Sequence, residues 1–230
     1  MARSFVALLS GGLDSTVAAY AARNEGPVGV ALVFDYGQRA AKREIEAAKQ
    51  IAKRLGAKCR VIKLPFLEEV TKTALVMNDK VIPQIKMAKL DDRSEAEKSA
   101  QDVWVPNRNG LFLNIATCVA EGEGFSEIVV GFNAEEAATF PDNSANFVDR
   151  VERCLELSTL SRPRLFVPTI GLNKTEIVRL GLSLDAPFGE VYSCYRGQKR
   201  QCGRCESCLR SMRAYEKAGI WPQMQERFGS

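Results

Sequence analysis

Short apolar runs alternate with longer segments of helical periodicity along most of the chain. The runs at 5–9 and 28–34 indicate buried strands, and the second lacks alternation, which is typical of a parallel strand covered on both faces. Further strands are expected at 59–64, 127–132 and 165–167, and helices at 14–23, 39–55, 111–121, 147–157 and from 173. This order predicts an α/β fold with a doubly wound parallel five-stranded sheet, whose ligands bind at the carboxyl ends of the strands.

Two helix ends carry sequence signals. Gly56 follows the amphipathic segment 39–55 and is placed to cap its carboxyl end. Asn173 is expected to be the N-cap of the last helix, with Glu176 three residues later completing a capping box.

Residues 65–103 interrupt the pattern with two prolines and the charged run 89–98. We expect an irregular insertion there, either a mobile lid or a solvated excursion on the surface. The length of the chain allows one large α/β domain or one domain with a small appendage. We therefore expect residues 1–230 to form a single domain that carries this insertion.

Composition and charge narrow the class of protein. The net charge is +4 and the basic residues are scattered, so no direct nucleic-acid partner is expected. No apolar run approaches the ~18 residues of a membrane span, and the apolar start is too short for a signal peptide. A cytoplasmic protein with no membrane partner is therefore expected, in a compartment where thiols stay reduced.

The chain contains no histidine. This excludes Ser-His-Asp and Cys-His nucleophiles and any zinc site with imidazole ligands. Proton transfer must use carboxylates, lysine, tyrosine, cysteine or water.

The string Ser-Gly-Gly-Leu-Asp-Ser-Thr at 10–16 lies between the first expected strand and helix. Two glycines let the backbone bring several N–H groups onto one anion, and the helix adds its positive end. The glycine and lysine spacing of a Walker A loop is missing, so the string suits a released pyrophosphate better than γ-phosphoryl transfer. Asp14 could hold Mg²⁺ that bridges the phosphates. The alternative interpretation is an ordinary turn with Asp14 capping the helix.

Four of the seven cysteines lie close together, within the segment 190–212. Four thiolates at this spacing can close a tetrahedron around one Zn²⁺, which predicts a small C-terminal zinc-binding subregion; an iron–sulfur cluster is the alternative. The expected ligands are Cys194, Cys202, Cys205 and Cys208. The remaining Cys59, Cys118 and Cys154 are expected to be small buried apolar residues.

The chain resembles a known family on several strings, of which the first and last are the most specific. The string at 10–16 resembles the signature of the PP-loop ATP pyrophosphatases, which adenylate an oxygen and release pyrophosphate. With further strings, the resemblance extends over nearly the whole length to the 7-cyano-7-deazaguanine synthase (QueC) family. These strings are Leu-Ser-Gly-Gly-Leu-Asp-Ser-Thr at 9–16, Phe-Asp-Tyr-Gly-Gln-Arg at 34–39, Val-Pro-Asn-Arg-Asn at 105–109, Gly-Phe-Asn at 131–133, Phe-Pro-Asp at 140–142, Asn-Lys-Thr-Glu-Ile at 173–177, and Ser-Cys-Tyr-Arg-Gly through Cys-Gly-Arg-Cys-Glu-Ser-Cys at 193–208.

The resemblance implies a fold, a reaction and a set of site residues. It implies an adenine nucleotide alpha hydrolase-like fold, a homodimer, and ATP-dependent conversion of 7-carboxy-7-deazaguanine and ammonia to the nitrile. It implies ATP contacts from Leu9, Ser10, Gly11, Gly12, Leu13, Asp14, Ser15 and Thr16, with Asp14, Ser15 and Lys174 catalytic. The implied substrate residues are Tyr36, Gln38, Arg39, Arg108, Asn109, Asn133 and Asp142.

The chain departs from the family pattern mainly in the strings on the substrate side. Ala40 stands where the family usually has His, Asn107 where it has Gly, and Ser144 where it has Arg. A different deazapurine or a protein acceptor is therefore an alternative substrate. Two further alternatives are a PP-loop tRNA thiolation enzyme and a zinc-dependent nucleic-acid binding module.

Overall fold

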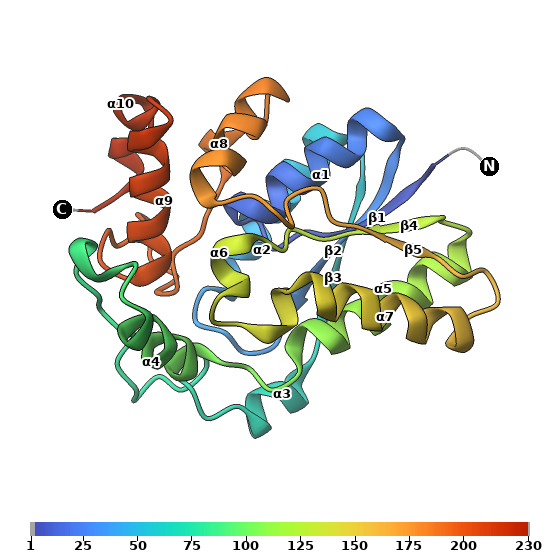
Figure 1. Cartoon of the computed structure of the whole chain (residues 1–230), viewed down its shortest axis with the longest axis horizontal. Helices are drawn as coiled ribbons and strands as arrows, with labels where there is room; N and C mark the ends of the chain where they lie inside the picture. The colour runs from blue at the N-terminus through green and yellow to red at the C-terminus, as the bar shows by residue number, and fades with distance from the viewer. Residues whose placement is uncertain (1–2, 230) are drawn as a thin grey trace.

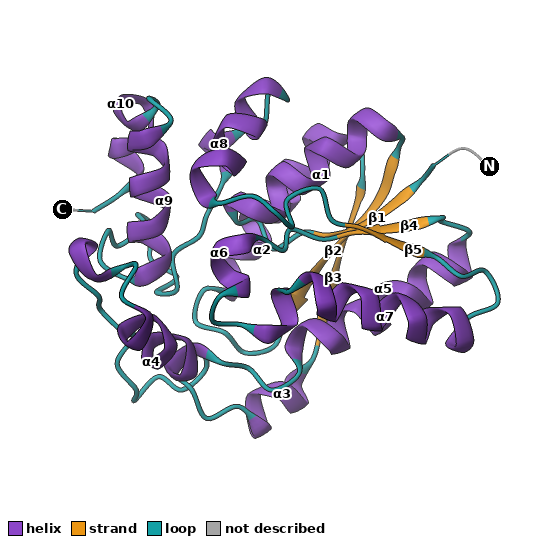
Figure 2. Cartoon of the chain, in the orientation of Figure 1, coloured by secondary structure: helices purple, strands orange, loops and turns teal. Residues whose placement is uncertain are grey.

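The computed structural model describes residues 3–229, and a parallel sheet of five strands runs through that part of the chain. The strands are β1 (Phe5–Leu8), β2 (Val28–Asp35), β3 (Lys58–Lys63), β4 (Glu127–Val129) and β5 (Arg164–Phe166). Their order is β3-β2-β1-β4-β5, and every neighbouring pair is parallel (Figure 2). From β1 the chain first adds β2 and β3 on one side of the sheet and later adds β4 and β5 on the other side. The crevice beside β1, where the strand order changes direction, is therefore the expected ligand site.

Helices cover both faces of the sheet, which confirms the doubly wound α/β fold. The helices α1 (Leu13–Glu25) and α2 (Ala41–Leu55) pack on one face, and α5 (Arg108–Glu123) and α7 (Ala145–Ser158) on the other (Figure 1). The helix α8 (Lys174–Ser183) packs against α1. Because both faces are covered, β1 is completely buried from Phe5 to Ala7.

The expected helix ends are confirmed. Gly56 ends α2 in the left-handed conformation, with φ of 71°. Asn173 and Glu176 form both hydrogen bonds of a capping box at the start of α8.

Residues 65–103 contain regular structure that the sequence pattern did not suggest. They include α3 (Pro65–Val70), the 3-10 helix η1 (Met87–Lys89) and α4 (Arg93–Val103). Asp92 caps α4 by accepting from the backbone N–H groups of Ser94 and Glu95. In α4 the residues Ala96, Ala100 and Val103 are buried at helical spacing. The charged residues between and before them make this pattern hard to recognise in the sequence.

The remaining elements lie near the carboxyl end of the sheet or towards the C-terminus. They are α6 (Ala134–Ala137), η2 (Pro141–Asn143), η3 (Phe188–Glu190), α9 (Glu206–Lys217), α10 (Trp221–Met224) and η4 (Gln225–Arg227). The helices α9 and α10 lie at the end of the molecule opposite the N-terminus (Figure 1). Among residues 3–229, the model has no helix with the length and apolar character that crossing a membrane requires.

The loop after β1 is fixed by one crowded glycine. Gly11 has φ of 79°, and a Cβ atom there would lie 2.8 Å from both the Glu44 carbonyl oxygen and the Ala47 Cβ atom of α2. The loop and α2 can approach this closely only because the side chain is absent.

We therefore predict that Gly11→Ala lowers the free energy of unfolding by about 2–4 kcal/mol, because left-handed strain adds to overpacking. Gly56→Ala is the matched control, since Gly56 also has positive φ but has nothing within 4 Å of the added Cβ. It is expected to lose only about 1 kcal/mol. Urea unfolding followed by circular dichroism measures both, and equal losses would contradict the role given to crowding.

Candidate active site

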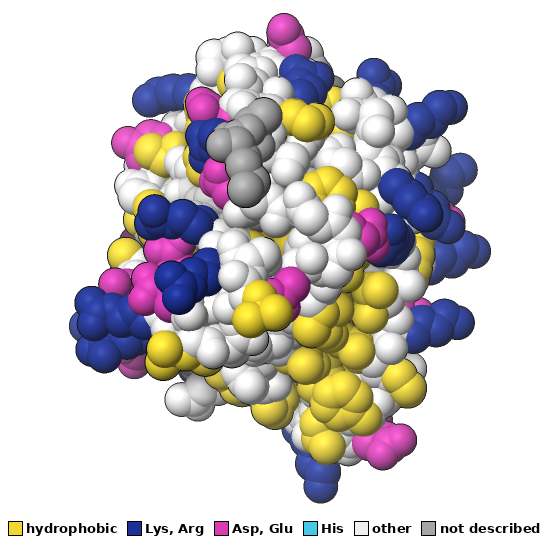
Figure 3. All heavy atoms as spheres, turned by 90° about the vertical axis from the view of Figure 1, so that its right-hand side faces the viewer, with side chains coloured by type: hydrophobic (Ala, Val, Ile, Leu, Met, Phe, Trp, Pro, Cys, Tyr) yellow, Lys and Arg dark blue, Asp and Glu magenta, His cyan; other side chains and the backbone are white. Residues whose placement is uncertain are grey.

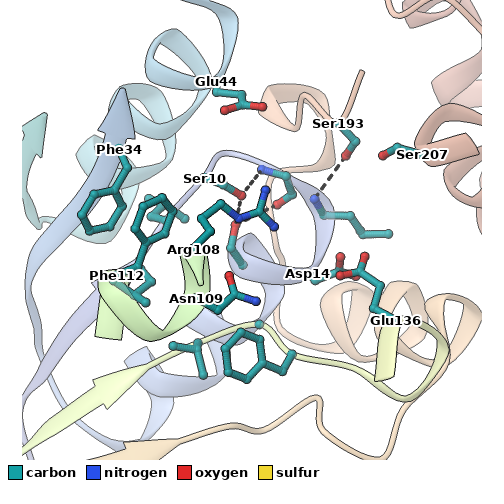
Figure 4. A pocket seen from close by; sticks show the side chains of 18 of the residues that line it. Ser10, Asp14, Phe34, Glu44, Arg108, Asn109, Phe112, Glu136, Ser193 and Ser207 are labelled. Carbon is teal, nitrogen blue, oxygen red and sulfur yellow. Dashed lines mark hydrogen bonds between the residues drawn. The ribbon is translucent and has the colours of Figure 1, made fainter. Parts of the chain in front are cut away.

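A cavity of about 250 Å³ opens at the carboxyl ends of β1, β2 and β4, as expected for this fold. Its lining includes most of the loop after β1, the start of α5, and side chains of α2, α6, α8 and α9 (Figure 4). The charged lining residues are Asp14, Glu44, Arg108, Glu136 and Lys174.

The loop at 10–16 places hydroxyl and N–H groups at this cavity. The Ser10 and Ser15 hydroxyl oxygens are 3.0 Å apart, and the Gly12 N–H donates to Ser10 Oγ at 3.3 Å (Figure 4). The N-cap of α1 is Gly12, which has no side chain of its own to cap the helix. Its first turn can therefore offer N–H groups and its positive end to an anion. Thr16 turns inward instead and donates to the Gly12 carbonyl at 2.6 Å.

Asp14 is bound to a lysine and does not cap α1. The Lys174 ammonium donates to Asp14 Oδ2 at 2.5 Å and to Glu136 Oε1 at 2.6 Å. The Lys174 and Asp14 side chains are 9% and 16% exposed, so this pair is largely shielded from water, whereas Glu136 is 35% exposed. The structure thus brings together Asp14 and Lys174, which are 160 residues apart in sequence.

Burial shapes the electrostatics of this group. Burial, helped by repulsion from Glu136, raises the pKa of Asp14 to about 6 although Lys174 opposes the shift. Burial alone would lower the pKa of Lys174, but attraction to Asp14 and Glu136 outweighs it and raises that pKa. The lysine therefore stays charged and is paired with two carboxylates. A phosphate that displaces one of these carboxylates can then pair with the ammonium in its place.

A second group of side chains lines the cavity farther from Lys174. The Phe34 and Phe112 rings stack at 3.8 Å between centroids, and Arg108 donates to the Tyr36 hydroxyl at 3.2 Å. Figure 4 shows Arg108 reaching between this aromatic pair and the loop at Ser10. Glu44 also faces the cavity, and burial raises the pKa of its carboxyl.

Some of the expected substrate residues line the cavity and the others do not. Tyr36, Arg108 and Asn109 line the cavity. Gln38 is buried beneath it and binds the Phe34 carbonyl oxygen and Glu44, each through its amide nitrogen. Arg39 lies outside and donates to the carbonyl oxygens of Met77 and Lys80.

Two more expected substrate residues have local structural contacts. Asn133 caps α6 by accepting from the Glu136 N–H at 3.0 Å. Asp142 lies in η2, where its carbonyl oxygen accepts from the Asn109 side chain at 3.3 Å. Neither is among the lining residues.

Sequence reasoning missed several residues that line the cavity: Glu44, Phe112, Glu136, Tyr195 and Ser207. Tyr195 belongs to the string at 193–208, which was already singled out. The neighbouring Ser193 accepts from the Leu13 N–H at 3.4 Å, so the cysteine-bearing segment closes over the loop. Glu136 had no signal of its own, because its partner is 38 residues away.

The four clustered cysteines are arranged as a metal ligand set. All four are buried, and the Sγ atoms of Cys194, Cys202, Cys205 and Cys208 lie within 4.8 Å of one another. Cys194 Sγ accepts backbone N–H groups from Arg196 at 3.4 Å and Cys202 at 3.3 Å. Such hydrogen bonds favour the thiolate form that binds metal.

The other three cysteines are less buried than expected. Cys118 and Cys154 are exposed on α5 and α7, and Cys59 is partly buried on the edge strand β3. The prediction of buried apolar residues was wrong for Cys118 and Cys154, because helical spacing alone did not show which face meets the sheet.

The fold and the site define an α/β protein whose switch point holds a loop rich in glycine and serine facing a buried lysine, with a four-cysteine cluster alongside. The chain belongs to the QueC family: the model described as "Queuosine biosynthesis protein QueC" matches residues 4–219.

Three relatives named 7-cyano-7-deazaguanine synthase match nearly the full chain. The protein of Pelotomaculum thermopropionicum is 49% identical and that of Desulforamulus reducens is 49% identical, with 94% of this chain covered in each case and 97% and 94% of the relatives. The archaeal protein of Methanosarcina barkeri is 45% identical over 97% of this chain and 98% of its own.

We predict that Cys205→Ser removes the metal bound by the cluster and lowers the melting temperature, because three remaining thiolates leave the tetrahedron open. Mass spectrometry of the purified protein should find about one metal ion per chain in the wild type and much less in the variant. Cys118→Ser, at an exposed cysteine, should keep the wild-type metal content. Equal metal content in the two variants would contradict this assignment.

Proposed function

We propose that this protein is a 7-cyano-7-deazaguanine synthase, an ATP-dependent ligase that forms carbon–nitrogen bonds. It converts 7-carboxy-7-deazaguanine and ammonia to 7-cyano-7-deazaguanine on the route to queuosine-type deazapurines. The observation that carries the proposal is the match over nearly the whole chain, which includes the loop, Lys174 and the four cysteines. In this structure these parts surround or adjoin one cavity.

The proposed reaction activates oxygen twice. The substrate carboxylate attacks the α-phosphorus of ATP, which gives an acyl adenylate and pyrophosphate. Ammonia then displaces AMP to form the amide. A second ATP adenylates the amide oxygen and releases a second pyrophosphate. Loss of AMP and of both protons on the amide nitrogen then leaves the nitrile.

This chain's residues supply position and charge for those steps. The start of α1, with Ser10 and Ser15, suits the departing pyrophosphate, and Lys174 suits the charge that develops on it. Among residues 3–229, Asp14 Oδ1 has no hydrogen-bond partner although it is buried, so this oxygen would be available to hold the Mg²⁺ that accompanies ATP. No histidine is needed, because the leaving groups are phosphates and AMP.

The second group in the cavity suits the deazaguanine. Arg108 faces the cavity with one hydrogen bond in this structure, to Tyr36, and a guanidinium matches the fork of a carboxylate. Phe34 and Phe112 offer apolar surface to a flat ring system. The Glu44 carboxylate suits N–H groups on the edge of a guanine-like base.

We also propose Zn²⁺ in the cysteine cluster, a cytoplasmic setting that keeps the thiols reduced, and a homodimer. Hydrophobic side chains gather on the lower part of the face seen in Figure 3. On α3, Phe66 and Val70 are 47% and 54% exposed. Such a surface favours association, and closed homodimers are the commonest oligomers.

The decisive test incubates the protein with MgATP, ammonium and 7-carboxy-7-deazaguanine. We expect AMP, pyrophosphate and the nitrile by mass spectrometry. Asp14→Asn should lower the rate at least about 100-fold by removing charge beside the phosphates, whereas Asp149→Asn on the exposed face of α7 should match the wild type. ADP without AMP would overturn the proposal. If the protein instead consumes another deazapurine, a protein or a sulfur donor without forming a nitrile, that molecule is the substrate in place of 7-carboxy-7-deazaguanine.

We predict that Arg108→Met raises KM for 7-carboxy-7-deazaguanine about 10–100-fold, because a charged hydrogen-bond pair contributes about 1.5–3 kcal/mol. KM for ATP should change less than about 3-fold, a distinction that steady-state kinetics resolves. The control is Arg153→Met, since Arg153 is exposed on α7. A rise in KM for ATP alone would place Arg108 on the nucleotide.

A further inference from the structure

Lys174 is held at its backbone as well as at its ammonium. Its N–H is one of the donors that the first turn of α8 leaves without a helical partner. Glu135 accepts that N–H through Oε1 at 2.9 Å. The adjacent Glu136 accepts from the Lys174 ammonium at 2.6 Å. Two consecutive residues of α6 therefore fix both ends of one lysine.

The helix α6 is only four residues long and depends on outside contacts for its position. Two arginines of α9 provide them. Glu135 Oε2 accepts from Arg210 Nη1 at 3.0 Å and from Arg213 Nη2 at 3.2 Å. The Glu135 and Arg210 side chains are 18% and 12% exposed, so solvent screens this pair little.

Arg210 also joins the insertion to the cysteine-bearing segment. It donates to Glu206 Oε1 at 2.9 Å and to the Leu90 carbonyl oxygen at 3.1 Å. Glu206 in turn accepts from the Ser99 hydroxyl on α4. The helix α9 begins directly after Cys205, so Arg210 joins residues 65–103 to the helix that follows the cysteine cluster.

We propose that Glu135 and Arg210 are positioning residues that hold Lys174 in place beside the loop at 10–16. Neither lines the cavity, so neither touches the ligand. Their effect passes through the backbone of Lys174 and through α6, which carries Glu136. The proposal rests on the proposed function only in taking MgATP as the ligand of the loop.

A pair that merely stabilised the fold would behave differently from a pair that acts through Lys174. In the first case, losing Arg210 would weaken ligand binding equally whether or not the lysine is present. In the second, the loss would have little effect once the lysine amine has been removed. A double-mutant cycle separates the two cases.

The experiment measures MgATP binding by calorimetry in the wild type, Arg210→Met, Lys174→Met and the double variant. We expect Arg210→Met to weaken binding about 10-fold in the wild-type background and less than about 2-fold with Lys174→Met, a coupling of about 1.0–1.4 kcal/mol. Arg179→Met is the matched control, because Arg179 also joins α8 to α9, through the Lys217 carbonyl oxygen, without Glu135. It should bind as the wild type does. Equal losses in both backgrounds would overturn the proposal.

Hydrogen exchange of the same variants gives an answer that needs no ligand. Arg210→Met should speed exchange at the Lys174 amide while α1 keeps its protection, because Glu135, the acceptor of that amide, loses one of its two arginine partners. Unchanged protection at Lys174, or faster exchange throughout the chain, would contradict a positioning role. Failure of nitrile formation with normal MgATP binding would sink the proposed function and leave this inference standing.

Discussion

The site depends on one buried cation shared between two carboxylates. Lys174 carries a single positive charge, and Asp14 and Glu136 both bind it within 2.6 Å. Burying these charges costs free energy that only mutual pairing offsets, so the carboxylates must be held in place by the fold. Asp14 is held by α1, and Glu136 is held by α6. The lysine is consequently poised beside the loop, where a phosphate can replace one of its partners.

The sheet topology explains why such distant residues meet. Parallel strands direct β1, β2 and β4 to the same edge, and the loops that follow them converge there. Gly131, just after β4, approaches so closely that a Cβ atom would lie 2.5 Å from the Ser15 nitrogen. The segment at 193–208 then closes the open side through Ser193. The segment that carries the four clustered cysteines thus contributes Ser193, Tyr195 and Ser207 to the wall of the cavity.

The features that the sequence predicts are those whose signals lie within a few neighbouring residues. The loop glycines, the capping box at Asn173 and the cysteine spacing each act over a few residues, so their pattern alone indicates their structure. The contacts of Glu136 and Arg210 cross 38 and 75 residues, and nothing near either position in sequence indicates the partner. The string at 34–39 indicated function as a whole, yet only Tyr36 lines the cavity, while Gln38 lies beneath it and Arg39 lies outside it.

The three departures from the family pattern occupy equivalent structural positions. Ala40, Asn107 and Ser144 are the N-caps of α2, α5 and α7, and the cavity lining includes none of them. Asn107 adopts φ of 49°, a conformation that glycine and asparagine both tolerate, so its exchange for glycine preserves the backbone. Ser144 accepts from the Phe147 N–H at 3.1 Å as an ordinary helix cap. The changes at these three positions therefore alter how helices begin and do not touch the lining of the cavity.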